Sequence, residues 1–538
     1  MMKRLLLLLC VMFNLMLHAQ EDAWVYFTDK DNVEASINNP ISILTQTAID
    51  RKAAKGIAID ARDVPVNEAY ITLVKSQDNI QVLAKSKWFN AVFVRGTDAD
   101  VINDLLLNDT LEFIDYIEFA DPNLNDLERV SQSDSEFLIE DTLISFNYGS
   151  AQNQVEMIGV DQLHLEDYTG EGIIVAILDS GFPNVDTMGA FQRLRDNEDL
   201  LGGYDFVDRT EDVFNFSGND HGTKVLSDMA GFVQDNFVGT APDASYYVFR
   251  TEDVSSETPV EEGYWVEAAE RADSLGVNVI NTSLGYRLYD NINYSHTNQD
   301  LDGSTTFITR GANIANEKGI LVVTSAGNSG SAGVVAPADG TGVFSIGAVD
   351  ADGNYAGFSS QGSDFQPTIK PDVAAQGQGS FVINSANAIV SNNGTSFSSP
   401  IMAGGIVSLM QALPNATNEE IKQFVRMSAS QYDNPDYFLG YGIPNLQEAL
   451  NIGLSLDQQQ ITELKVFPNP AETILNIQTQ IGEHSTRLRI INILGNTVLE
   501  KTLYDSHTEL DVSRLNKGMY LLNFQSGGAS KTFKLTKS

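Results

Sequence analysis

The sequence predicts a multidomain α/β protein built around a parallel sheet flanked by helices. Near-continuous apolar runs alternate with helical segments between residues 153 and 454, which is typical of strands covered on both faces. A small α+β unit precedes this region, and short alternating strands typical of a β-sandwich follow it. The 538 residues have room for about three to five domains of roughly 100 to 200 residues each. Apolar residues make up 42% of the chain, so sizeable cores can form.

The first 19 residues are predicted to form a secretory signal peptide. The basic start MMKR is followed by an apolar run from Leu5 to Leu17, and we expect cleavage after Ala19. This run is too short to cross a bilayer, and no later stretch of 18 apolar residues exists, so no transmembrane segment is expected. The only cysteine, Cys10, lies inside the signal. The mature protein is therefore expected to have no disulfide and to depend on packing or bound ions.

Residues 20–120 are expected to form the small α+β unit. Ala23–Phe27 is typical of a strand, Asp98–Leu107 has helical spacing with acids at its start, and Phe113–Phe119 alternates like a half-buried strand. From residue 121 to 152 the chain is polar. This stretch is predicted to be an exposed, cleavable linker.

Four apolar runs predict strands in the central region, residues 153–454. They are Ile173–Leu178, Ser245–Phe249, Val277–Asn281 and Ile320–Thr324. Three of them lead directly into segments rich in Asp, Ser or Gly. Because a parallel sheet places its functional site at the carboxyl ends of its strands, we expect the site at these segments.

Asp179, His221 and Ser396 are candidates for nucleophilic catalysis. Asp179 follows the first of these strands, His221 begins a helical stretch that runs to Gly231, and Ser396 precedes a helical stretch over 397–413. A serine hydroxyl is a weak nucleophile at neutral pH. A neutral imidazole must take its proton, and a buried carboxylate must orient that imidazole.

Three further residues fit the same chemistry. Asn328 follows the strand Ile320–Thr324 and could donate its side-chain N–H to a developing oxyanion. Gly394 lets the backbone approach a substrate closely, and a helix start at Ser396 favours negative charge. We expect Pro400 in the first helical turn, where its missing N–H is tolerated.

The order Asp179, His221, Ser396 and the motifs around these residues resemble the subtilisin-like serine proteases. The matching motifs are AILDSG at 176–181, DHGT at 220–223, SAGN at 325–328 and GTSFSSP at 394–400, with KPDV at 370–373 and APA at 336–338. The match covers about residues 153–453. It implies a subtilisin-like parallel sheet, a catalytic triad of Asp179, His221 and Ser396, and Asn328 as the oxyanion donor.

The same resemblance implies that two backbone segments bind an extended peptide between them. They are Ser283, Leu284 and Gly285, and Ser325, Ala326 and Gly327. Recognition by strand addition uses main-chain groups, so we expect weak sequence specificity. Two departures from the family affect the pocket and not the reacting groups. Lys224 stands where many members have a second histidine, and Phe397-Ser398 replaces the commoner Met-Ala.

Charge and ligand spacing exclude two classes of function. Lys and Arg total 33 against 72 Asp and Glu, a net charge of −39, so nucleic acid is not an expected partner. No His, Cys and Glu residues have the spacing of a catalytic zinc site, and no cofactor is expected.

The loop Asn298–Gly303 could hold a structural Ca²⁺, or it could be a solvated acidic loop. Outside the signal and the C-terminal region, His164 and His296 are expected to be surface or structural residues, in contrast to His221.

The two flanking regions resemble accessory modules. Residues 20–120 resemble, in position and strand-helix pattern, the inhibitory propeptide of subtilisin-like enzymes; a permanent binding domain is the alternative.

Residues 461–538 carry nine Lys or Arg and seven Asp or Glu, which leaves a net charge of 24 − 65 = −41 on the rest of the chain. The segments VFPNP at 466–470, LNI at 475–477, LG at 494–495 and KGMYL at 517–521 resemble the sorting domains of the type IX secretion system. A carbohydrate-binding β-sandwich is the alternative there.

The sequence therefore predicts a secreted or surface-attached serine endopeptidase that cleaves proteins or peptides. Its other expected partners are its own propeptide and, through residues 461–538, a secretion machinery. A catalytically silent surface adhesin on the same fold is the alternative from another class. The sequence does not distinguish a scavenging enzyme from a processing protease with one target.

Overall fold

The computed structural model describes residues 20–124, 146–462, 465–478, 486–492, 497–503, 507–526 and 529–538. The predicted signal peptide and residues 125–145 of the predicted linker lie outside the described residues, as does the LG segment at 494–495.

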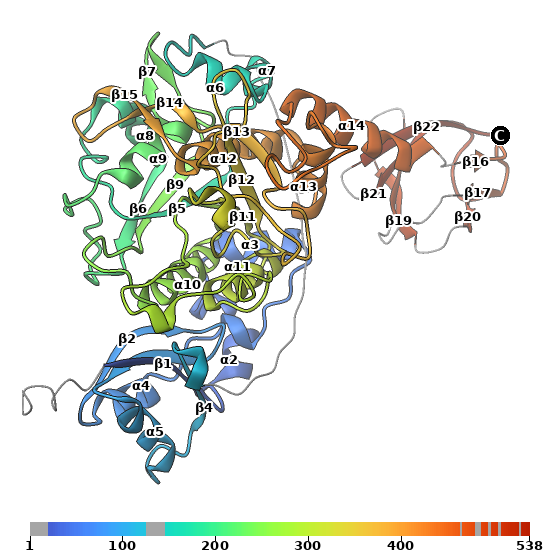
Figure 1. The fold of residues 1–538 in the computed structure, drawn as a ribbon. Coiled ribbons are helices and arrows are strands. Elements are labelled where there is room, and N and C mark those ends of the chain that lie inside the picture. The colour runs from blue at the N-terminus through green and yellow to red at the C-terminus, as the bar shows by residue number, and fades with distance from the viewer. Residues whose placement is uncertain are drawn as a thin grey trace, which may run out of the picture.

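The central part of the chain is a seven-stranded sheet with helices on both faces (Figure 1). The strand order is β13-β12-β11-β10-β5-β9-β6, and every neighbouring pair is parallel. This confirms the predicted parallel sheet. The strands are β5 (Ile174–Asp179), β6 (Leu200–Asp205), β9 (Ser245–Arg250), β10 (Val279–Thr282), β11 (Leu321–Ser325), β12 (Phe344–Val349) and β13 (Val373–Gln376).

Alternate residues of each strand pack against opposite layers of helices. In β5, Val175 and Ile177 join the apolar core under α9 and α12, whereas Ala176 and Leu178 join the core under α10 and α11. Apolar side chains on both faces explain why these strands are near-continuous hydrophobic runs. The helices are α6 (Gln152–Glu156), α7 (Val160–Leu165), α8 (Gln192–Asp196), α9 (His221–Ala230), α10 (Val260–Leu275), α11 (Phe307–Glu317), α12 (Thr395–Ala412), α13 (Asn418–Met427) and α14 (Leu446–Thr462). Two hairpins lie outside the sheet, β7 (Phe232–Val233) with β8 (Phe237–Val238) and β14 (Gln378–Ile383) with β15 (Ile389–Asn393).

The N-terminal part is a four-stranded antiparallel sheet in the order β2-β3-β1-β4, and it lies against α10 and α11 (Figure 1). Along β1, Ala23 and Val25 face a core of their own, and Trp24 and Tyr26 face the core that contains α10 and α11. The sheet is thus buried on both sides. Its elements are β1 (Glu21–Phe27), α2 (Val33–Asn38), α3 (Gln46–Ala54), α4 (Glu68–Lys75), β2 (Ile80–Ser86), β3 (Ala91–Gly96), α5 (Ala99–Leu107) and β4 (Ile114–Phe119).

Buried charges join the N-terminal part to α10 as well. Asp273 on α10 accepts from Arg51 and lies 2.8 Å from the Lys52 ammonium, and both cations come from α3. The side chains of Lys52 and Asp273 are fully buried. Glu270, one turn earlier on α10, accepts the backbone N–H groups of Lys87 and Trp88 at 2.9 Å each.

The C-terminal part consists of two small antiparallel sheets around one apolar core, and it follows α14 (Figure 1). This confirms the predicted strand-rich module. The sheets are β16-β17-β20 and β19-β18-β21-β22, with β16 (Lys465–Phe467), β17 (Ile474–Gln478), β18 (Thr486–Asn492), β19 (Thr497–Leu503), β20 (His507–Asp511), β21 (Gly518–Ser526) and β22 (Ala529–Lys537). Within the described residues, no helix is long and apolar enough to span a membrane.

Candidate active site

Asp179 and His221 form a hydrogen-bonded pair at the carboxyl edge of the central sheet. Asp179 is the last residue of β5, and its Oδ1 lies 2.7 Å from His221 Nδ1. The Asp179 side chain is fully buried, whereas that of His221 is 28% exposed. A carboxylate can only accept hydrogen bonds, so Nδ1 of the ring carries the proton. Nε2 of the neutral ring is therefore left with its lone pair free to act as a base.

The start of α9 holds His221 against the end of β5. Thr223 donates its backbone N–H to the carbonyl oxygen of Gly181 at 3.2 Å. A Cβ on Gly222 would lie only 2.6 Å from that same oxygen, so this close approach requires glycine. The backbone N–H of His221 donates to Asn219 Oδ1 at 2.9 Å, which satisfies one of the free amides at the helix start.

Ser396 is the second residue of α12, which begins at Thr395. The helix starts two residues before the predicted 397, so Pro400 lies in the second turn, not in the first as predicted. There it lacks the N–H that would bond to the carbonyl oxygen of Ser396 four residues earlier. The hydroxyl of Ser283 donates to that oxygen at 2.8 Å instead. This hydrogen bond joins the start of α12 to the segment that follows β10.

The Ser396 hydroxyl donates to the carbonyl oxygen of Ser283 at 3.4 Å. Within the described residues, the Ser396 hydroxyl donates to this carbonyl oxygen and makes no hydrogen bond to His221. Contacts of this kind are often long before a substrate is bound. The ring of Phe397, the next residue, lies 5.8 Å from the His221 ring, which places the start of α12 beside the imidazole.

Asn328 lies beside the residue that precedes Ser396. Its Oδ1 accepts the backbone N–H of Thr395 at 2.9 Å and the Thr395 hydroxyl at 3.1 Å. With the oxygen held in this way, the amide nitrogen faces Gly394, where it would lie 3.7 Å from an added Cβ. Gly394 has φ of 149°, a conformation that favours glycine. The Asn328 N–H is thus directed to the space before Ser396.

The two predicted peptide-binding segments differ in what their backbones offer. In Ser325, Ala326 and Gly327, the N–H of Ala326 donates to Ile346 and the carbonyl of Gly327 accepts from Ser360. These groups are used inside the protein, so this segment is suited to forming a wall. Ser283, Leu284 and Gly285 follow β10, and Gly285 is exposed. A Cβ there would meet Val335 at 2.2 Å.

Charges around His221 adjust its basicity. Burial lowers the pKa of His221, but Asp179, through its charge and its hydrogen bond, and Glu252 together raise it above the usual value of 6.5. Lys224 opposes them, although it also pairs with Asp220 at 2.6 Å. No motif in the sequence marks Glu252 as a member of the site. The influence of its carboxylate depends on the fold, which brings the end of β9 beside the end of β5.

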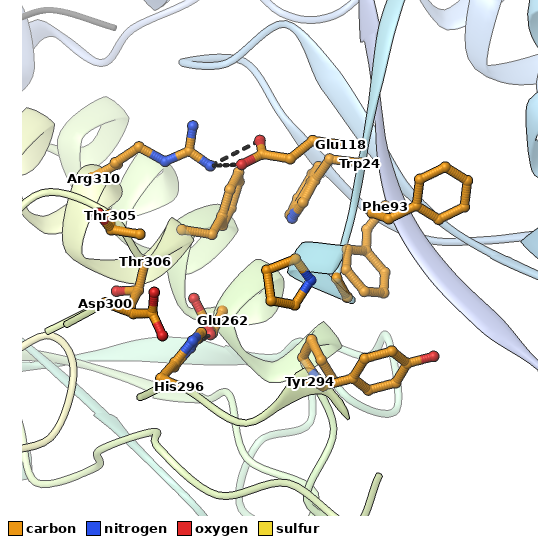
Figure 2. A pocket seen from close by; sticks show the side chains of 15 residues that line it. Trp24, Phe93, Glu118, Glu262, Tyr294, His296, Asp300, Thr305, Thr306 and Arg310 are labelled. Atoms are coloured by element: carbon orange, nitrogen blue, oxygen red, sulfur yellow. Dashed lines mark hydrogen bonds and ion pairs between the residues drawn. The ribbon is translucent and has the colours of Figure 1, made fainter. Parts of the chain in front are cut away.

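The other two histidines of the central part are structural, as predicted. His164 is buried, with Nδ1 2.8 Å from the Tyr148 hydroxyl and Nε2 3.1 Å from the carbonyl oxygen of Thr240. His296 lies 2.7 Å from Glu262. The side chains of His296 and Glu262 help to line a pocket of about 200 Å³ between the N-terminal sheet and the central part (Figure 2). Asp179, His221 and Ser396 do not line this pocket.

The loop Asn298–Gly303 uses its carboxylates locally. Asp300 accepts the backbone N–H of Thr297 at 2.6 Å, and Asp302 accepts those of Ser304 and Thr305 at 2.9 and 2.8 Å. Across the part of the chain that the structure describes, no three His, Cys, Asp or Glu side chains gather closely enough to hold a metal ion. A structural Ca²⁺ at this loop stays a prediction.

A base, an orienting carboxylate and a serine at a helix start, all at one edge of a parallel sheet, are the parts of a serine hydrolase. Comparison with known proteins narrows this class. Residues 170–442 match the model of the subtilase family, residues 22–136 match the peptidase S8 propeptide domain of Bacteroidota, and residues 465–538 match the secretion system C-terminal sorting domain.

Two relatives agree with the subtilase match. Subtilisin DY of Bacillus licheniformis is 29% identical over 300 residues, 55% of this chain and 97% of that protein. Subtilisin E of Bacillus subtilis is 28% identical over 342 residues, 62% of this chain and 81% of that protein. The solved structure of MycP1 from Mycobacterium smegmatis aligns at 21% identity and a TM-score of 0.45, covering 59% of this chain and 87% of that one. The chain belongs to the subtilase family and is a serine endopeptidase with a propeptide domain and a sorting domain. The sorting domain marks it as secreted or attached to the cell surface.

Proposed function

We propose that this protease hydrolyses peptide bonds through an acyl-enzyme on Ser396. The Asp179–His221 hydrogen bond of 2.7 Å, with Asp179 fully buried, is the observation that carries the proposal. It fixes the tautomer that leaves Nε2 free to accept a proton. The start of α12, where Ser396 stands, lies beside the same imidazole. All the reacting groups are side chains of the chain, so the reaction needs no cofactor.

The reaction proceeds in two halves. The Ser396 oxygen attacks the carbonyl carbon of the scissile bond while its proton passes to His221 Nε2. The tetrahedral intermediate then collapses, the C–N bond breaks, and the amine leaves with that proton. A water molecule repeats the sequence on the ester: it gives a proton to His221, attacks the acyl carbon, and releases the acid and the serine hydroxyl.

The oxyanion of each intermediate is stabilised by two donors. The backbone N–H of Ser396 is one of the amides at the start of α12 that lack an acceptor within the helix. The side-chain N–H of Asn328 is the other, because its oxygen is held by Thr395. Donors that are in position before the reaction cost no reorganisation when the charge develops.

The flanking domains act on this enzyme in sequence. We infer that the N-terminal domain keeps the protease inactive until it is cut off, since it packs on α10 and α11 through buried contacts. The C-terminal domain would engage the secretion machinery after the signal peptide has directed the chain across the inner membrane. Both removals leave the central part as the mature enzyme.

A serine-reactive fluorophosphonate tests the assignment on the purified secreted protein. Labelling of the wild type at Ser396, its absence in Ser396→Ala, and hydrolysis of a casein substrate by the wild type alone are expected. Mass spectrometry of the mature chain should find termini near residues 120–155 and 455–465. Substantial proteolysis by purified Ser396→Ala would contradict the proposal. A folded and fully processed wild type that takes no label would favour a binding protein on a protease fold.

A further inference from the structure

Glu252 is an acidic residue beside the catalytic pair that the proposed reaction does not use. It follows the end of β9 by two residues, and the intervening Thr251 donates its backbone N–H to the carbonyl oxygen of Asp179 at 3.0 Å. The end of β9 is therefore fixed to the end of β5. In this position the charge of Glu252 helps to raise the pKa of His221, and the charge of His221 lowers that of Glu252.

The Glu252 carboxylate is weakly held. The hydroxyl of Tyr286 donates to its Oε2 at 3.4 Å, which is a long hydrogen bond. Among the ion pairs of the described residues, none involves Glu252. Burial, Glu257 and Asp179 raise its pKa to about 7. A half-buried carboxylate without a cation is costly to ionise, so an incoming cation would be favoured here.

The neighbouring cations of the protein are committed elsewhere. Arg250, two residues before Glu252, lies 2.8 Å from Asp205 and 2.7 Å from Asp208. Lys224 pairs with Asp220. His221 balances the charge of Glu252 only while it is protonated. When His221 is neutral, as the reaction requires, neither Arg250 nor Lys224 supplies the counter-charge, and a bound ligand can supply it.

The path of a bound peptide brings one of its side chains to this position. The segment Ser283–Gly285 adjoins Ser396 through two hydrogen bonds, so a peptide paired with it has its scissile bond near Ser283. Tyr286, whose hydroxyl contacts Glu252, directly follows that segment. Side chains of an extended peptide alternate between two faces. When the first residue before the scissile bond points between the two binding segments, the second residue before that bond points to the opposite face, toward His221 and Glu252.

We propose that Glu252 selects a Lys or Arg side chain at the second residue before the scissile bond. The inference rests on the proposed function, because hydrolysis at Ser396 is what turns this contact into a cleavage preference. The ammonium or guanidinium group donates a charge-assisted hydrogen bond to the carboxylate and supplies the cation that the chain does not. Main-chain pairing alone would leave the enzyme with little preference at this position. Glu252 would thus make it selective for basic peptides.

Two peptides that differ in one charge test the proposal on the processed enzyme. One has lysine at the second residue before the scissile bond, and the other has norleucine, which is neutral and nearly as long. We expect the wild type to show kcat/KM about tenfold or more in favour of lysine, the scale of one hydrogen bond to a charged group. In Glu252→Gln the ratio should fall to near one. Asp290→Asn, which removes an acid from the neighbouring exposed loop, should keep the wild-type ratio.

The ratio should also grow as the pH rises through about 7, because Glu252 ionises over that range. The groups that act on this titration are Glu257, Glu261, Asp179, His221 and Tyr286. The titration of His221 affects both peptides equally, so it cancels in the ratio. In Glu252→Gln the ratio should not change with pH.

Equal cleavage of the two peptides by a wild type that takes the fluorophosphonate label would overturn this proposal and leave the proposed function intact. A lysine preference that survives in Glu252→Gln would overturn it as well. A processed enzyme that neither takes the label nor cleaves any peptide would overturn both. If the Gln variant does not fold, the pH dependence of the wild-type ratio decides the question: a ratio that does not grow as the pH rises through about 7 would overturn the proposal.

Discussion

The indole ring of Trp24 stacks on the phenyl ring of Phe307, with centroids 3.9 Å apart and planes inclined by 16°. Trp24 lies in β1 of the propeptide domain, and Phe307 is the first residue of α11 in the protease domain. Both side chains are almost fully buried. Beside them, Arg310 of α11 pairs with Glu118 of β4 at 2.7 Å (Figure 2). An aromatic pair rimmed by an ion pair is the arrangement of a binding hot spot between proteins.

Replacing Trp24 with alanine should weaken retention of the propeptide. The change removes the stacked pair and leaves a cavity, and loss of a buried tryptophan costs about 3–5 kcal/mol in a core. We expect the propeptide to dissociate at least tenfold faster after the linker is cut, as measured by size-exclusion chromatography and mass spectrometry. Leu107→Ala is the control, because Leu107 is 78% exposed at the end of α5, whose buried residues Ile102 and Leu105 face the core of the propeptide domain itself. Retention equal to that of the wild type would show that the stack contributes little.

Replacing Asp273 with alanine should destabilise the precursor and leave the mature enzyme nearly unchanged. In the precursor the variant leaves Arg51 buried without its anion, whereas Lys52 keeps its buried pair with Asp63 at 3.1 Å. Leaving one buried charge unpaired costs about 3–5 kcal/mol. After the propeptide has left, neither cation remains. Thermal unfolding of Ser396→Ala precursors and of the mature proteins measures the difference. Glu211→Ala, which breaks an exposed pair with Arg271, should change either form by less than about 1 kcal/mol.

The propeptide should bind more weakly at higher pH because of Glu270. Burial under the propeptide raises the pKa of Glu270 to about 7, although Lys87 and its hydrogen-bond donors oppose this. The free protease exposes the carboxylate, and its pKa returns toward 4.5. The complex therefore holds a proton that the separated parts release. Its extra stability is complete below about pH 4.5 and is lost as the pH rises through 7.

The dissociation constant of the propeptide at pH 5 and pH 8 measures this effect. With pKa values of 4.5 in the free protease and about 7 in the complex, an increase of up to roughly seventyfold is expected for the wild type. A clearly smaller increase is expected for Glu270→Gln, which stays neutral. The same increase in both proteins would assign the pH dependence to other groups.

The sequence predicted the parts of the site that are local and missed those that form only on folding. Asp179 could be assigned because it ends an apolar strand, and His221 because glycine and a helix start follow it. Glu252 has no such pattern, since its role depends on β9 pairing with β5. The same holds for Asp273 and Glu270, which are ordinary helix acids until the propeptide covers them.

The start of α12 shows a second limit of prediction. The run of small polar residues before Pro400 gave no sign that the helix would begin at Thr395. A proline in the second turn is unfavourable by local rules. The fold tolerates it because Ser283, more than a hundred residues earlier, donates to the carbonyl oxygen that the proline leaves free. A distant side chain thus overrides a local preference.

Replacing Asn328 with alanine should lower kcat far more than it changes KM. The side-chain N–H is positioned for the oxyanion and not for the ground-state peptide, so its loss destabilises only the transition state. The expected loss of about 10² to 10³ in kcat is carried over from the corresponding asparagine of a subtilisin. Steady-state kinetics on one peptide measures it, and fluorophosphonate labelling should persist because Ser396, His221 and Asp179 are unchanged. A change confined to KM would argue against the oxyanion role.

Replacing Asp228 with asparagine should stabilise the protein at neutral and alkaline pH. Asp228 is buried on α9; its Oδ1 accepts from Gln154 at 3.1 Å, and its Oδ2 is buried without a hydrogen-bond partner in the described structure. Burial raises the pKa of Asp228 well above its usual value. The folded chain therefore keeps a proton that the unfolded chain loses above about pH 4. The stability of the wild type falls by up to about 1.4 kcal/mol per pH unit from there to the raised pKa.

Asparagine has nearly the same shape as the protonated acid and does not titrate, so this pH-dependent loss should vanish in Asp228→Asn. Thermal unfolding of Ser396→Ala precursors, with and without the substitution, measures the difference from pH 4 to pH 8 without autolysis. The two proteins should be close in stability at pH 4, and the variant should gain steadily as the pH rises. A gap that stays constant with pH would mean that Asp228 is already ionised in the folded protein. In that case an ordered water molecule or a rearranged donor must satisfy its second oxygen, since a buried charge without a partner is too costly to persist.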